Sequence, residues 1–229
     1  MTNTHKKITS TVLFTLIGIL AMQIPVTNLV GSSAKFTVFD CFGPIAGSFL
    51  GTIPGIISVL LMQIVNLIIH GKESFDIGTI IRLFPMLFAV QYFSKKSKLN
   101  IIIPAMAIIA FIANPIGRTV WYFALFWTIP MVCNKFREKS LLAKSLGSTF
   151  TAHAVGGALW VWLIPLPKTV WINLIPVVFV ERFIFAAGIT AAYIIMNNIL
   201  YFVSTQSKFN FSFIINENFI LNHSKKYAN

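Results

Sequence analysis

Residues 36–70 read FTVFDCFGPIAGSFLGTIPGIISVLLMQIVNLIIH and are almost entirely apolar. As one α-helix this run would be about 50 Å long, whereas the hydrocarbon core of a bilayer is about 30 Å thick. Its first half is rich in Gly and Pro, which interrupt helices unless neighbouring groups bind the freed backbone atoms. The run therefore predicts two membrane crossings, residues 36–50 and 52–70, joined between Gly51 and Gly55.

The composition of the whole chain is that of a membrane protein. Of its 229 residues, 56% are hydrophobic and 10% are charged, and the mean hydropathy is +0.80. Soluble domains average about 45–50% apolar and 25% charged residues. We expect one all-α domain, a polytopic transmembrane helical bundle in the cell membrane over residues 1–203, followed by a polar cytoplasmic tail over residues 204–229.

The basic residues set the orientation of the predicted bundle. With two crossings in residues 36–70 and about eight in all, twelve of the eighteen Lys and Arg residues fall on the side of the N-terminus. Cytoplasmic loops collect such residues, so both termini are predicted to be cytoplasmic. Residues 36–50 and 100–114 are short enough to be re-entrant instead, which would leave as few as six crossings and keep both termini on the same side. The predicted crossings are 9–30, 36–50, 52–70, 77–93, 100–114, 118–133, 145–165 and 170–203.

The distribution of the basic residues also indicates which partners to expect. The net charge of +12 follows from the cytoplasmic loops, so we expect contact with the lipid bilayer and no nucleic-acid partner. The stretch 134–148 is basic and amphipathic, and we expect it to lie along the inner membrane surface.

Glu181 and Arg182 are adjacent charged residues inside an apolar run, VVFVERFIFAAG. A charge at the bilayer centre costs about 2.5–3.5 kcal/mol, so such residues usually face the bundle interior and find partners. By helical rise, Glu181 lies about 16 Å below the outer face of the membrane and His153 lies about 12 Å above the cytoplasmic face. In a hydrocarbon core of about 30 Å, the two residues are at nearly the same depth. Successive helical residues point in different directions, so we expect His153 to partner Glu181 and another group to partner Arg182. A structural ion network and a ligand or proton site both fit this pattern.

Other polar residues gather in the outer half of the predicted bundle, which indicates a cavity open to the outside. A single Asn or Gln in a membrane helix often only forms a hydrogen bond to a neighbouring helix. The prediction of a cavity therefore rests on the clustering of these polar residues and not on any one of them. The Trp residues near the outer ends fit an interfacial belt or a stacking surface for a flat ligand. The predicted substrate-binding residues are Gln23, Asp40, Asn66, Arg82, Arg118, His153, Glu181 and Arg182.

Motifs for catalysis and for metal binding are not found in the sequence. Cys41 and Cys133 are too far apart to indicate a metal site or a disulfide framework. There is no phosphate-binding loop and no His-Glu-x-x-His motif. We assign no catalytic residue, no metal and no cofactor.

The segment order resembles a known family over about residues 9–133. A long first span, an outer loop, a short crossing through GPIAGSFLGTIPG, and GTIIRLFPMLFAVQYFSKKSK with its terminal basic residues are similar to the substrate-binding S component of energy-coupling factor vitamin transporters. The resemblance implies a small helical bundle that binds a solute from outside and docks on a coupling subunit with two ATPases. It also implies that residues 31–42 line the pocket. The first span lacks the family's Ala-x-x-x-Ala motif. The predicted bundle also has two spans more than the six of the family.

We therefore predict a solute-uptake component that binds a small anionic or heterocyclic metabolite, with Arg side chains on its anionic group. The coupling subunit and the ATPases would be other chains. Two alternatives remain open: an intramembrane enzyme acting on a lipid or isoprenoid, with Glu181 or His153 as general base, and a non-catalytic membrane assembly subunit.

Overall fold

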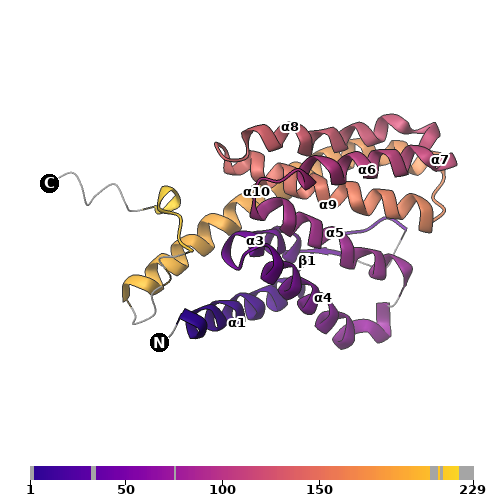
Figure 1. Ribbon diagram of the computed structural model, residues 1–229. Coiled ribbons are helices and arrows are strands. Elements are labelled where there is room, and N and C mark those ends of the chain that lie inside the picture. Colours follow the sequence, from indigo (N-terminus) through magenta and orange to yellow (C-terminus); the bar gives the residue numbers. More distant parts are fainter. Residues whose placement is uncertain (1–2, 32–34, 75, 207–210, 212–213, 222–229) are drawn as a thin grey trace.

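The computed structural model describes residues 3–31, 35–74, 76–206, 211 and 214–221, and these form a helical bundle with one small hairpin (Figure 1). The first helix, α1 (Asn3–Met22), is followed by strands β1 (Pro25–Asn28) and β2 (Lys35–Thr37), which pair antiparallel. The predicted first span, 9–30, thus ends as a helix at Met22. Pro25 favours extended backbone in the residue before it, which is why the helix does not continue.

The long apolar run, residues 36–70, is divided at Gly51, where the backbone adopts φ 93°. Before this glycine lie three short helical pieces, α2 (Phe39–Phe42), η1 (Gly43–Ile45) and α3 (Ala46–Phe49). After it comes the long helix α4 (Thr52–Ser74). A left-handed backbone is readily adopted only by glycine, so Gly51 provides the break that the sequence predicts.

The centre of the bundle is the contact between α5 (Ile77–Ser94) and α9 (Leu141–Leu163). Helices α6 (Leu99–Ala113) and α8 (Ile129–Phe136) lie along α9 (Figure 1). They are joined by α7 (Pro115–Thr119) and the 3₁₀ segment η2 (Trp121–Thr128). The predicted crossing 118–133 is therefore built from three short helical pieces.

Residues 134–148 do not form one amphipathic segment along a surface, as expected, because their second half begins a helix that packs inside the bundle. The chain turns after α8, and the side chain of Ser140 caps a new helix by accepting a hydrogen bond from Ala143 N at 3.2 Å. Ser145, Gly147 and Ser148 are buried in the first turns of this helix, α9. Their small side chains permit close helix packing, which the basic residues around them conceal in the sequence.

The last helix, α10 (Lys168–Gln206), has 39 residues and extends well beyond the bundle at its C-terminal end (Figure 1). The described part of the predicted tail folds back onto it through a short turn, η3 (Glu217–Phe219). The amide of Asn197 donates to Asn216 O at 2.9 Å and accepts from Asn216 N at 2.8 Å. The tail is thus held against α10 over these residues.

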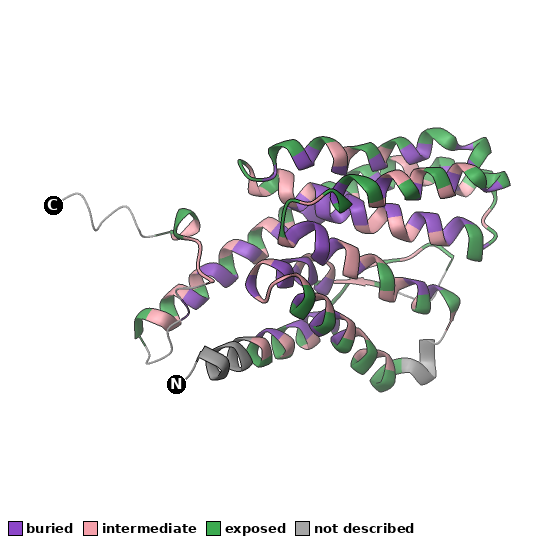
Figure 2. Ribbon diagram, viewed as in Figure 1, coloured by how far each residue is buried: buried purple, intermediate pink, exposed green. Residues whose placement is uncertain are grey.

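Within the described part of the chain, three helical segments are long and apolar enough to cross a membrane: Thr52–His70, Ile77–Ser94 and Lys168–Gln206. Thr11–Met22 and Leu99–Ala113 are apolar but shorter. The outer faces of the long helices are widely exposed (Figure 2), and α4 carries exposed Ile53, Ile57, Leu61 and Ile68. The all-α expectation holds for the body of the fold, while the eight crossings stay a prediction.

Candidate functional site

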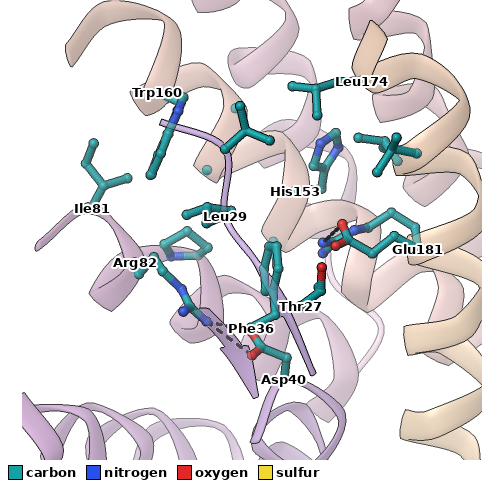
Figure 3. Close-up of a pocket in the computed structure, with 18 of the residues that line it drawn as sticks. Thr27, Leu29, Phe36, Asp40, Ile81, Arg82, His153, Trp160, Leu174 and Glu181 are labelled. Atoms are coloured by element: carbon teal, nitrogen blue, oxygen red, sulfur yellow. Dashed lines mark hydrogen bonds and ion pairs between the residues drawn. The ribbon is translucent and has the colours of Figure 1, made fainter. Parts of the chain in front are cut away.

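A cavity of about 170 Å³ lies between the hairpin, α5, α9 and α10 (Figure 3). The hairpin side contributes Thr27, Leu29 and Phe36, and Asp40 follows at the start of α2. The resemblance implied that residues 31–42 line a pocket, and two of these four residues belong to that segment; residues 32–34 lie outside the described part of the chain. Five predicted site residues line the cavity: Asp40, Arg82, His153, Glu181 and Arg182.

The first ion pair in this wall joins Arg82 of α5 to Asp40. Arg82 Nη2 lies 3.1 Å from Asp40 Oδ2, and Arg82 Nη1 donates to the carbonyl oxygen of Lys35. Asp40 Oδ2 also accepts from the backbone N–H of Thr37 at 2.7 Å. Arg82 therefore links α5 to both β2 and α2, and it holds the hairpin side of the cavity in place.

The second ion pair joins Glu181 and Arg182 directly, with Arg182 Nη2 at 2.5 Å from Glu181 Oε2. Arg182 Nη1 also donates to Thr149 Oγ1 on α9 at 3.4 Å. The expectation that Glu181 and Arg182 have separate partners is wrong, because the long Arg182 side chain bends back to its neighbour. Glu181 Oε1 has no hydrogen-bond partner among the described residues.

The ring of Phe36 connects the two ion pairs (Figure 3). The guanidinium carbon of Arg82 lies 4.9 Å from the centre of this ring, and that of Arg182 lies 4.8 Å from it. Both distances are within the range of cation–π attraction. One aromatic side chain from the hairpin is thus in contact with both cations of the cavity.

His153 takes its hydrogen bond from an aromatic residue and not from Glu181. Trp127 Nε1 donates to His153 Nδ1 at 3.0 Å. An indole N–H can only donate, so Nδ1 must be the acceptor and the neutral ring carries its proton on Nε2. The described residues offer no acceptor to this Nε2–H. His153 and Glu181 line the same cavity, but no hydrogen bond joins them in the described structure.

Two further donors in the cavity wall have no partner. Trp171 Nε1 and Arg182 Nε are buried and lack a hydrogen-bond acceptor among the described residues. The indole of Trp171 is fixed by edge-on contacts with Phe111 and Phe123, each with ring centres 5.1 Å apart. A buried donor without an acceptor costs about 1–3 kcal/mol, so such groups usually indicate a missing water or ligand.

The remaining predicted residues lie elsewhere. Gln23 and Asn66 line a neighbouring pocket of about 380 Å³ that shares Arg82 with the main cavity. Gln23 Nε2 donates to Asn66 Oδ1 at 3.0 Å, which is the interhelical hydrogen bond that the sequence left open as an alternative. Arg118 lies outside both pockets, on α7, and its nearest acceptors are the carbonyl oxygens of Ile112 and Ala113 at 3.5 Å.

Several contacts of the site could not be found from sequence. Phe36, on β2, belongs to the segment that the resemblance places at the pocket, but no sequence pattern sets its ring between two arginines. Thr149 bonds to Arg182 from α9, and nothing in the sequence distinguishes it from the other small polar residues of that helix. Trp160 and Trp171 are buried in the cavity wall, whereas Trp121 and Trp162 are exposed. The predicted Trp belt therefore divides into a buried pair in the cavity wall and an exposed pair, a difference that the sequence does not reveal. Among the described residues, no three His, Cys, Asp or Glu side chains gather as a metal site would require.

Comparison of the chain with known protein families, with curated proteins and with solved structures finds no match. The resemblance to S components therefore stays a prediction from segment order.

Proposed function

We propose that this chain is the solute-binding component of a membrane uptake system, similar to the S components of energy-coupling factor transporters. Its solute is a small anionic or heterocyclic metabolite held in the cavity between the hairpin and α10. The coupling subunit and the ATPases are other chains.

The observation that carries this proposal is that two residues of an aromatic-walled cavity, Trp171 and Arg182, each have a buried donor, Nε1 and Nε, without a partner among the described residues. Small-molecule sites are typically concave and largely apolar, with a few polar groups that fix the ligand's orientation. The enzyme alternative has less support, because His153 cannot act as a base while its basic nitrogen, Nδ1, accepts from Trp127, and the charge of Glu181 is balanced by Arg182 at Oε2.

Native mass spectrometry tests the proposal directly. The protein, extracted gently from its own membrane, should carry one small water-soluble molecule per chain. Ala152→Phe should remove it, because Ala152 lines the cavity and a Phe ring there would occupy the ligand's space. Arg118→Gln, outside the cavity, should leave occupancy unchanged. A chain that carries only lipid or a partner protein would contradict the proposal and favour the enzyme or assembly alternatives.

We also propose that the chain crosses the membrane about eight times with both termini cytoplasmic. The support is the distribution of basic residues and the apolar outer faces of α4, α5 and α10. Single cysteines introduced at Lys35 and Lys168 should react with a membrane-impermeant maleimide in intact cells. Those at Lys98 and Lys139 should react only after the membrane is opened. Labelling of all four sites in intact cells would contradict this topology.

A further inference from the structure

The charges of the cavity wall limit the kind of solute that it can hold. Its charged lining residues are two carboxylates and two guanidinium groups, and each guanidinium is already paired with a carboxylate. His153 is neutral in the tautomer that its bond from Trp127 requires. The described wall therefore has no net charge. A carboxylate or phosphate entering it would have to compete with Asp40 or Glu181 for a guanidinium.

The cavity residues that have unpaired hydrogen-bonding groups include both donors and an acceptor. Trp171 Nε1 and His153 Nε2 are donors without an acceptor among the described residues, and both can only donate in this state. Glu181 Oε1 is a free acceptor on the opposite side of the cavity from Trp160 (Figure 3). A ligand that satisfies these groups must present both acceptors and an N–H or O–H donor.

The apolar groups in the wall favour a flat ring. Phe36, Phe123, Trp160 and Trp171 line the cavity from four different elements. Aromatic faces and edges pack well against planar rings, and a planar ligand loses little conformational entropy on binding.

We propose that the bound solute carries no net charge at neutral pH and is a planar nitrogen heterocycle with an amide-like edge. Its carbonyl oxygen or ring nitrogen accepts from Trp171 and His153, and its N–H donates to Glu181. This inference rests on the proposed function and selects the heterocyclic alternative over the anionic one. Both ion pairs stay intact in the complex and hold the wall residues in place, and neither guanidinium binds the solute.

The test is the chemical identity of the molecule released by denaturing wild-type protein that was extracted from its own membrane. An uncharged, ultraviolet-absorbing nitrogen heterocycle, not retained on an anion-exchange column at pH 7, would support the inference. A released carboxylate or phosphate would overturn it and leave the proposed function standing. Release of no water-soluble molecule would overturn the proposed function and this inference with it.

A pair of tryptophan variants tests the assigned contact. Trp171→Phe should lower ligand occupancy at least tenfold, because the ligand's acceptor loses its donor. It should leave the thermal midpoint of the ligand-free protein within a few degrees, since Trp171 Nε1 bonds to no described residue. Trp162→Phe is the matched control: Trp162 is exposed, and its Nε1 donates to the Ala110 carbonyl at 2.9 Å. Equal occupancy in wild type, Trp171→Phe and Trp162→Phe would overturn the assignment of Trp171.

Discussion

Glu181→Gln is expected to lower the free energy of unfolding by about 3 kcal/mol, the typical effect of breaking a buried ion pair. The substitution removes the charge that balances Arg182, whose side chain is 5% exposed. A guanidinium cannot release its proton in a protein, so Arg182 would stay buried and charged. Thermal unfolding in a fixed detergent, followed by tryptophan fluorescence, measures the loss.

A double variant separates the ion pair from other causes of instability. Glu181→Gln with Arg182→Met should be more stable than Glu181→Gln alone, because replacing both charges removes the uncompensated cation. The control is Glu138→Gln. Glu138 also pairs with an adjacent arginine, Arg137, at 3.2 Å; the arginine is 1% exposed, but the carboxylate is 65% exposed. Because water already screens this carboxylate, its loss should change stability by less than about 1 kcal/mol, although the guanidinium that it leaves is as buried as that of Arg182. If the double variant is no more stable than Glu181→Gln alone, the ion-pair explanation is wrong.

Gly147→Ala is expected to destabilise the contact between α5 and α9 by about 3 kcal/mol, the upper range for overpacking a core. A Cβ at Gly147 would lie 2.1 Å from Tyr92 Oη and 2.2 Å from Tyr92 Cζ. Tyr92 is fully buried and donates to Pro130 O at 2.8 Å, so its ring cannot move without losing that bond. The measurement is the thermal midpoint of the ligand-free protein.

Gly156→Ala on the same helix is the control for Gly147→Ala. Its nearest atom would be Pro85 Cγ at 3.3 Å, a contact that a small shift relieves. Alanine also favours a helix over glycine by about 1 kcal/mol, so this variant should be close to wild type. If Gly147→Ala unfolds at the same temperature as Gly156→Ala, then α5 and α9 do not approach this closely.

The sequence predicts those features that depend on local backbone chemistry or on the cost of burying charge. Gly51 was expected near the break in residues 36–70 because of its surrounding Gly and Pro residues, and the structure has the break there. Asp40, Arg82, Glu181 and Arg182 were selected because charges in apolar runs need partners, and they share one cavity.

Features that depend on side-chain direction could not be predicted. Spacing along a helix suggested that Glu181 and Arg182 diverge, but it does not describe how far an arginine side chain can bend back. No sequence pattern indicates that the indole of Trp127 bonds to His153, since the two residues belong to different segments of the chain. The predicted first span, 9–30, includes strand β1, because no sequence signal distinguishes Val26 and its neighbours from the end of a helix.

The central claim is that the cavity between the hairpin and α10 holds a water-soluble molecule. An electron cryo-microscopy or crystal structure of the protein, purified in lipid from its own membrane, tests it most directly. The account predicts compact, flat non-protein density bounded by His153, Trp171 and Glu181, with both ion pairs retained. An empty cavity, or a lipid chain entering it from between the helices, would contradict the account.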